Sequence, residues 1–331
     1  MHIITTEEHW VSPGIAAAGA AANAALSPHF NEAFDPTNGY PLSPAPGSLI
    51  DLDHARIANM DRNGIDTQVL SVLGPQLLPS AVAVDLTRAA NDHIASVIEG
   101  NPDRFAAFAA IPTTAGGDAS ANELERCMAR PGFTGSLIFG RSEERFLDQA
   151  EYEPFLAASA RLHAPIYLHP TPPPRGISDL ISDGLAPDVS ARFETAAWGW
   201  HIETGTHFLH MALSGVFDRH PELHVILGHW GEMVPFWMDR LDQALPPAMT
   251  GCAQPISGYL RNNVFVTPSG MWQQSHLRYC LDVLGADRII FSVDYPFIDN
   301  QGAREFLEQA DLTASDRDKI AHGNAERLLG L

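Results

Sequence analysis

Short apolar runs alternate with longer helical segments along nearly the whole chain, and this alternation limits the possible fold more than any other feature. Runs that are apolar throughout are typical of strands buried on both faces of a parallel sheet. The predicted strands are His2–Thr6, Thr67–Leu73, Phe105–Ile111, Gly135–Phe139, Pro165–Leu168, Leu223–Leu227, Asn263–Val266 and Arg288–Ser292.

Helical patterns separate these runs, and the first, Asp53–Asn63, ends at Gly64, a residue type that commonly stops a helix. Eight βα units in 331 residues predict a single (β/α)8 TIM barrel, with one domain over residues 1–331. The other predicted helices are Asp85–Glu99, Ser120–Arg130, Trp200–Phe217, Glu232–Leu245, Gln274–Leu284, Gly302–Gln309 and Ser315–Leu329.

Two long segments do not fit a minimal barrel. Trp10–Leu49 follows the first predicted strand, and Pro170–Ala197 follows the fifth. Insertions after barrel strands lie at the catalytic face, so we expect these loops to cover the active site. The alternative is that parts of both are surface loops without a role in the site.

Composition argues against several classes of function. Asp and Glu total 40 while Lys and Arg total 20, which gives a formal net charge of −20. An acidic surface repels phosphate, so we expect neither nucleic acid nor a membrane as a partner. The hydrophobic fraction of 45% indicates a folded, globular chain.

Lysine and cysteine are both scarce. Lys319 is the only lysine, which argues against a Schiff-base aldolase, a P-loop and a binuclear hydrolase bridged by a carbamylated lysine. Cys127, Cys252 and Cys280 lack metal-ligand spacing and indicate a reducing, cytoplasmic location. The N-terminus lacks the pattern of a signal peptide, and Ile15–Leu26 is too short to cross a bilayer.

Ionisable residues follow several predicted strands. Glu7 and His9 follow the first, two positions apart, so that both point to one face of an extended chain; His169 ends the fifth, His229 the sixth and Asp294 the eighth. On a barrel these residues converge at one mouth, where two imidazoles and two carboxylates suit zinc or manganese. Because no lysine can supply a bridging carbamate, we expect one divalent ion.

His229 is either a further ligand or a base. Glu232 follows it by three residues and can orient its imidazole. The alternative for Glu232 is a carboxylate favoured by the dipole at a helix N-terminus, and both roles can hold together.

Four motifs carry a resemblance to a known family: Glu7-Glu8-His9-Trp10, Tyr167-Leu168-His169-Pro170, Leu227-Gly228-His229-Trp230-Gly231-Glu232 and Ser292-Val293-Asp294-Tyr295-Pro296-Phe297. With supporting stretches at 59–66, 101–105 and 215–221, the chain resembles the amidohydrolase-2 family over nearly its whole length. Within that family it is similar to the non-oxidative decarboxylases of the γ-resorcylate (2,6-dihydroxybenzoate) and aminocarboxymuconate semialdehyde types.

The resemblance implies a role for each of these residues. Glu7, His9, His169 and Asp294 match the metal ligands, and Asp294, with His229 and its partner Glu232, matches the catalytic group. In the benzoate decarboxylases the metal is understood to bind the substrate carboxylate and its ortho-hydroxyl, while the aspartate protonates the ring carbon. The implied function is metal-dependent, non-oxidative decarboxylation of an ortho-hydroxylated aromatic carboxylic acid.

Phe139-Gly140 departs from the resemblance, because these decarboxylases usually carry Asn-Gly at the end of strand four. An aromatic ring there allows a different or larger substrate than 2,6-dihydroxybenzoate, although Phe139 is equally compatible with ordinary core packing. Arg240 matches an arginine near the substrate, with a surface salt bridge as the alternative. The predicted substrate-binding residues are Trp10, Phe139, Arg141, Trp200, Arg240 and Phe297.

Two other functions stay open on the sequence. A metal-dependent hydrolase, a lactonase acting on a ring-cleavage product, would use metal-activated water. A metal-binding scaffold without activity would leave His229 and Glu232 unexplained. Since no Gly-rich dinucleotide fingerprint follows a strand, no organic cofactor is expected. The expected partners are a small aromatic acid and other copies of the chain, as a homodimer or homotetramer.

Overall fold

A parallel sheet forms the centre of the chain. The computed structural model describes residues 1–30, 44–45 and 47–331, and within them seven strands pair in sequence order. Every neighbouring pair is parallel. The strands are β1 (Ile4–Trp10), β2 (Thr67–Val72), β3 (Phe105–Ala109), β4 (Phe133–Phe139), β5 (Ile166–His169), β6 (Val225–Leu227) and β7 (Val264–Val266).

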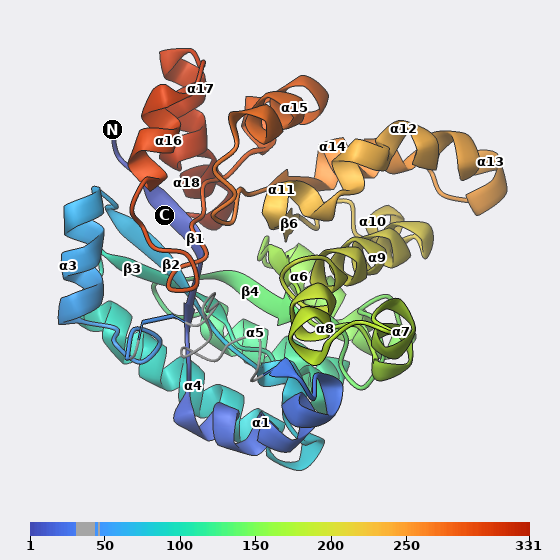
Figure 1. Ribbon diagram of the computed structural model, residues 1–331, viewed down its shortest axis with the longest axis horizontal. Helices are drawn as coiled ribbons and strands as arrows, with labels where there is room; N and C mark the ends of the chain where they lie inside the picture. Colours follow the sequence, from blue (N-terminus) through green and yellow to red (C-terminus); the bar gives the residue numbers. More distant parts are fainter. Residues whose placement is uncertain (31–43, 46) are drawn as a thin grey trace.

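Helices connect the strands and lie outside the sheet (Figure 1), as parallel pairing requires of its crossovers. Within the described residues no helix has the length and apolar character needed to cross a membrane. The helices are α1 (Pro13–Leu26), α3 (His54–Asn63), α4 (Ser80–Gly100), α5 (Gly117–Met128), α6 (Glu153–Arg161), α7 (Arg175–Ile181), α8 (Pro187–Glu194), α9 (Gly199–Leu213), α10 (Val216–Arg219), α11 (His229–Glu232), α12 (Val234–Ala244), α13 (Pro247–Thr250), α14 (Ile256–Asn263), α15 (Gln274–Leu284), α16 (Ala303–Gln309), α17 (Ala314–Asp318) and α18 (Asn324–Leu329).

The sheet is curled, and its two faces pack into different cores. Successive side chains of a strand point to opposite faces, so Leu70 and Val69 of β2 belong to different clusters. The larger cluster lies between the sheet and the helices. The smaller one joins alternate residues from neighbouring strands, among them Val69, Phe108, Leu137, Tyr167, Ile226 and Phe265. The concave face of the sheet is therefore filled mainly by strand side chains, together with Ala325 and Leu329 of α18.

One predicted strand, Arg288–Ser292, is wrong. This segment makes only isolated parallel bridges, Val266↔Ile289 and Thr6↔Ser292, which place it between β7 and β1. Arg288 belongs to a short 3-10 turn, Ala286–Arg288. Beyond Ser292 the pairing stops because the buried carboxyl group of Glu8 accepts hydrogen bonds from the backbone N–H groups of Val293 and Tyr295, each at 3.0 Å. Those amides bind a side chain and do not extend a backbone ladder.

Several other boundaries differ from the sequence prediction. The first strand continues past Thr6 to Trp10, because it stays paired with β2 as far as Val72. The stretch expected to be a loop after it begins with α1, and the stretch after the fifth strand contains α7 and α8. Residues 31–43 and 46 of the first stretch lie outside the described residues. The short helices α6 and α14 were not predicted.

Arg56 of α3 fastens β1 to the turn that precedes α3. Its guanidinium donates to the backbone carbonyl oxygen of His9 at 2.6 Å, to that of Asp51 at 2.9 Å and to that of Ser48 at 3.2 Å. The side chain is fully buried, and its guanidinium also lies 4.8 Å from the centre of the Tyr295 ring. A planar fork with several fixed donors suits this position better than the point charge of a lysine.

We expect Arg56→Ala to lower the free energy of unfolding by about 3–5 kcal/mol, because it leaves buried backbone carbonyl groups without their donor and removes a positive charge near the buried Glu8 carboxyl. Arg56→Lys should lose most of the same stability. Urea unfolding of the metal-free protein measures the change without a contribution from metal binding. The matched control is Arg62→Ala on the exposed side of α3, expected within about 0.5 kcal/mol of the parent. A loss below about 1 kcal/mol for Arg56→Ala would contradict the assigned role.

Candidate metal centre

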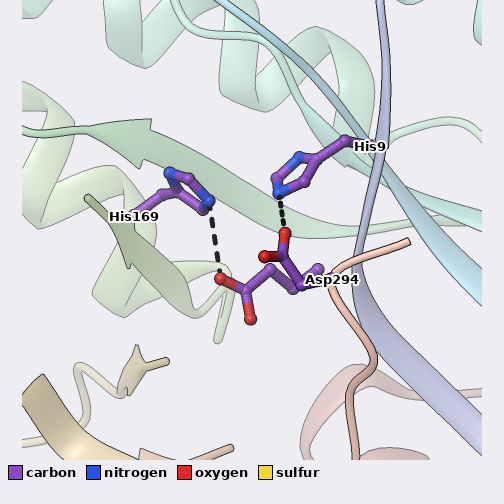
Figure 2. A group of neighbouring side chains, drawn as sticks. His9, His169 and Asp294 are labelled. Atoms are coloured by element: carbon purple, nitrogen blue, oxygen red, sulfur yellow. Dashed lines mark ion pairs between the residues drawn. The ribbon is translucent and has the colours of Figure 1, made fainter. Parts of the chain in front are cut away.

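Four predicted ligands meet at the ends of distant strands. Atoms of Glu7, His9, His169 and Asp294 lie within 4.8 Å of one another. The His9 Nε2 atom is 3.1 Å from Asp294 Oδ1, and the His169 Nε2 atom is 3.5 Å from Glu7 Oε1. Figure 2 shows the imidazoles of His9 and His169 turned toward the carboxylates between them. The sequence therefore predicted correctly which residues come together.

Glu7 reaches this cluster through an irregular backbone. The register of β1 against β2 shifts between Thr6 and Glu8, which leaves Glu7 as the extra residue of a bulge, with φ of 72°. Bulges redirect a side chain next to a functional site, at the cost of a left-handed backbone that non-glycine residues rarely adopt. The regular alternation expected from the sequence is thus replaced by a bulge that brings Glu7 and His9 into the same cluster.

Both imidazoles are held by their Nδ1 atoms. His9 Nδ1 lies 2.9 Å from Ser71 Oγ, and His169 Nδ1 lies 2.9 Å from the carbonyl oxygen of Pro170. A carbonyl only accepts, so His169 Nδ1 carries the proton and its Nε2 presents a lone pair. Histidines that bind metals are oriented in this way by a partner on the second ring nitrogen.

Glu7 uses one carboxylate oxygen for the protein and leaves the other free. Its Oε2 accepts hydrogen bonds from the hydroxyls of Tyr167, Ser269 and Ser292. Its Oε1 and the Nε2 of His9 are buried atoms without a hydrogen-bond partner among the described residues. Burying an acceptor oxygen and an imidazole nitrogen without hydrogen-bond partners costs free energy of folding, unless a cation binds both atoms. The donor set of two imidazoles and two carboxylates therefore fits a divalent metal ion.

The electrostatics of the cluster point the same way. Burial, and then the neighbouring charge of Asp294, raises the pKa of Glu7, and burial likewise raises the pKa of Asp294. Burial lowers the pKa of His9 to about 3 and that of His169 well below its usual value. The imidazoles are neutral, and the ionised form of each carboxyl is disfavoured. A positive ion at this place would stabilise the ionised carboxylates.

A second cluster lies beside the first and joins His229 to Glu232. His229 Nδ1 donates to Glu232 Oε1 at 2.8 Å. Burial alone would lower the pKa of His229, but the charge and hydrogen bond of Glu232 raise it to about 10. Burial alone would raise the pKa of Glu232, but His229 and His201 hold it below its usual value. At neutral pH the pair is an imidazolium next to a carboxylate.

His201 of α9 is a member of this cluster that the sequence did not single out. Its Nδ1 lies 2.7 Å from the second oxygen of Glu232, and its Nε2 lies 3.0 Å from the carbonyl oxygen of Ala196. Glu232 is therefore held on both oxygens. In the sequence His201 stands among the other histidines of α9, and nothing in that spacing distinguishes it.

The backbone from His229 to Met233 is left-handed throughout, with φ between 48° and 86°. Gly231 has the largest of these values, and a side chain on it would meet Pro235 at 2.7 Å. Gly228, just before this stretch, has no room either, since a Cβ would lie 2.9 Å from Ser269 Oγ and 3.0 Å from Glu7 Oε1. Such strain is concentrated at sites where the surrounding structure must fix side chains.

A cavity of about 560 Å³ opens onto the cluster. Asp294, His169 and His229 lie in its wall, as do the predicted substrate contacts Phe139, Trp200 and Phe297. The ring of Phe139 packs 4.5 Å from that of His169. This cavity joins the two clusters to a largely apolar space large enough for a small organic molecule.

Three other predicted substrate contacts are not part of the described cavity wall. Trp10 is buried, with its ring 5.5 Å from that of His93. Arg141 forms an ion pair with Glu203 and lies over the ring of Phe146 at 3.7 Å. Arg240 is exposed on α12. Contacts of these residues with a substrate therefore stay a prediction.

Comparisons with known proteins agree with this geometry. The chain matches the profile of the Amidohydrolase family over residues 50–331. The chain belongs to the amidohydrolase family. Among its relatives, γ-resorcylate decarboxylase of a Rhizobium species is 36% identical over 297 residues, which cover 86% of this amidohydrolase and 88% of the relative.

Two solved structures resemble this amidohydrolase along its whole length. A dihydroxybenzoic acid decarboxylase from a Polaromonas species, with bound manganese and the inhibitor 2-nitroresorcinol, is 31% identical with a TM-score of 0.86, covering 100% of this chain and 97% of that one. A 5-carboxyvanillate decarboxylase from Novosphingobium aromaticivorans, complexed with manganese and 4-hydroxy-3-methoxy-5-nitrobenzoic acid, is 29% identical with a TM-score of 0.87, covering 100% and 96%.

We expect the purified protein to carry about one divalent ion per chain, bound by the first cluster. His169→Ala should lose that ion, whereas the matched variant His201→Ala in the neighbouring cluster should keep it. Elemental analysis after loading with manganese or zinc and removal of excess metal measures the content. Two ions per chain, or equal loss of metal in both variants, would contradict the assignment.

We also expect metal affinity to fall with pH between about pH 8 and pH 5. The raised pKa values of Glu7 and Asp294 mean that both carboxyls bind protons at higher pH than usual, and a cation must displace those protons. The affinity should therefore change by up to about tenfold per pH unit for each carboxyl that titrates. Titration calorimetry in buffers of different ionisation enthalpy should show proton release. Metal binding that is independent of pH, with no protons released, would refute this expectation.

Proposed function

We propose that this amidohydrolase decarboxylates an ortho-hydroxylated aromatic acid with the help of one divalent metal, zinc or manganese, and without an organic cofactor. The observation that carries the proposal is the position of Asp294, which belongs to the ligand cluster and also lines the cavity beside the cationic His229. The named decarboxylases among its relatives and structural neighbours, two of them solved with manganese, support it.

The reaction replaces a carboxylate by hydrogen and needs one proton for each turnover. A cation held by Glu7, His9, His169 and Asp294 would bind the carboxylate and the ortho-hydroxyl and withdraw electron density from both. Asp294 delivers its proton to the ring carbon that carries the carboxylate, forming a C–H bond. The C–C bond then breaks, its electron pair restores the aromatic ring, and carbon dioxide leaves.

His229 and Glu232 serve this proton transfer. A nearby cation lowers the pKa of a carboxyl, so Asp294 beside a bound metal would seldom carry a proton and must take one from a neighbouring group before each turnover. His229 faces the cavity and is protonated at neutral pH, while Glu232 fixes the orientation of its ring from Nδ1. We assign His229 as the proton reservoir and Glu232 as its positioning residue.

The finer features of the fold belong to the same proposal. We infer that residues 288–292, bridged to both β7 and β1, close the sheet into a (β/α)8 barrel that forms one domain over residues 1–331. The segments after β1 and β5 would then cover the active site, as their residues in the cavity wall suggest. Exposed apolar side chains on α12 and α13, such as Phe236, Trp237 and Met249, support a homodimer or homotetramer. A cytoplasmic location is consistent with three free cysteines.

The decisive experiment mixes the metal-loaded enzyme with 2-hydroxybenzoates, 4-hydroxybenzoate and candidate lactones, and follows the release of carbon dioxide and of acid separately. Ortho-hydroxybenzoates should release carbon dioxide, while 4-hydroxybenzoate, which cannot chelate a cation, should not. The matching phenol with concentrated bicarbonate should be carboxylated slowly. Acid from a lactone, with no carbon dioxide from any hydroxybenzoate, would establish the hydrolase alternative.

The role of Asp294 has a separate prediction. Asp294→Asn keeps an oxygen ligand but has no proton to give, so turnover should fall about 100- to 10,000-fold while most of the metal is retained. The matched control is Asp299→Asn in the same loop, whose exposed carboxylate should be dispensable. Turnover and metal content are measured on the same preparations. Near-normal turnover of Asp294→Asn would exclude this residue as the proton donor.

A further inference from the structure

The cavity is much larger than the aromatic acid that the proposed reaction requires. Its volume is about 560 Å³, whereas a cavity of about 150 Å³ is enough to bind benzene. A carboxylate and an ortho-hydroxyl add only a few atoms to such a ring, and these would lie at the metal end. More than half of the space therefore lies beyond the reacting part of the substrate.

The character of that remaining space is apolar and uncharged. Away from Asp294, His169 and His229, its wall is formed mainly by aliphatic and aromatic side chains. Asn23, Gln76 and Thr171 contribute carboxamide and hydroxyl groups. Among the described residues, neither lysine nor arginine lines the cavity. A second carboxylate or another charged group on the substrate would find no counter-ion there, whereas an alkyl chain or a second ring would be removed from water favourably.

Helix α1 creates much of this room. Ala16, Ala20 and Ala24 recur every fourth residue, so they share one face of the helix, and all three line the cavity. These side chains are exposed, and the surface that they expose borders the cavity. Ile15 and Gly19, on the adjoining positions, are buried, and a Cβ on Gly19 would lie 3.1 Å from the Cβ of Leu77. The helix is thus packed closely on Leu77, while three of the side chains that it turns to the cavity, those of Ala16, Ala20 and Ala24, are single methyl groups.

We propose that the natural substrate is an ortho-hydroxylated aromatic acid that carries an uncharged apolar substituent, an alkyl chain of several carbons or a fused ring, which lies along α1. This inference rests on the proposed function for the reacting end of the substrate. For the other end it rests only on the size and apolar walls of the cavity. The same argument disfavours benzoates that carry a second carboxylate as substrates.

Binding provides a test that does not depend on turnover. Isothermal titration of the metal-loaded enzyme with phenol and its 3-propyl, 3-pentyl and 3-heptyl derivatives, the products that such substrates would yield, should show an affinity that rises up to fourfold or so with each buried methylene. Ala20→Phe fills the face of α1 and should lower the affinity for 3-pentylphenol by about tenfold or more, with phenol itself within about twofold. The control Ala21→Phe places the same ring on an exposed neighbour that is not part of the cavity wall.

The kinetic counterpart uses 2-hydroxybenzoate and its pentyl derivatives substituted at carbons 4 and 6, both of which would give 3-pentylphenol. At least one of these should have a kcat/KM about tenfold or more above that of the parent acid, and Ala20→Phe should remove the advantage selectively. Two outcomes would overturn the proposed apolar substituent while leaving the decarboxylation in place. In the first, acids are decarboxylated but the affinity for the alkylphenols does not rise with chain length. In the second, Ala20→Phe and Ala21→Phe lower that affinity equally. If the affinity for the alkylphenols rises with chain length and only Ala20→Phe lowers it, but no acid is decarboxylated, the apolar recognition is upheld and the proposed function is overturned.

Discussion

The burial of two carboxylates side by side, Glu7 and Asp294, is the constraint on which the rest of the site depends. Each raises the cost of ionising the other, and burial adds to that cost. The two imidazoles next to them are neutral and so supply no compensating charge. Nearby positive charge makes this arrangement more favourable: the His229 imidazolium lowers the pKa of both carboxyls, and a divalent cation among the four ligands would lower it further, which is why the geometry fits a metal. Hydroxyls of Tyr167 and Ser269 fix one oxygen of Glu7, which leaves the other without a hydrogen-bond partner among the described residues and available to a cation.

Holding that arrangement requires the backbone to give up regular structure at several points. Glu7, His229 and Asp294 all have left-handed backbones, with φ of 72°, 48° and 72°. Such conformations persist only where neighbouring groups determine them fully. Glu8 does so for the segment around Asp294 by binding two of its amides, and Arg56 does so for His9 by binding its carbonyl oxygen. The residues that support the site are therefore a buried carboxyl group and a buried guanidinium, each placed where hydrogen bonds with the backbone satisfy it.

The sequence was sufficient to predict which residues converge, because parallel strands that alternate with helices bring their carboxyl ends to one edge. It could not reveal how they converge. The bulge at Glu7 follows from pairing with β2, and the end of backbone pairing after Ser292 follows from the long-range contact with Glu8. The sequence did not single out His201, because its place in the site depends on a hydrogen bond with Glu232, thirty-one positions away, and not on local spacing. Helix α1 forms in a run of Ala that was expected to be a loop, since its packing against Leu77 is not visible in local composition.

Reaction and recognition are separated in this structure, and the separation has a physical basis. The groups that we propose to hold a cation and to transfer protons are ionisable, and they are tied to strand ends and to each other by hydrogen bonds and ion pairs, so a change in any one disturbs the rest. The walls of the distal cavity are apolar and interact only by contact, so a substitution there changes volume without changing charge. Helix α1 contributes exposed alanines to that wall and packs against Leu77 at Gly19. On this proposal, substitutions along one face of α1 would change the size of the substrate that the protein accepts, while the reaction at Asp294 and His229 would stay the same.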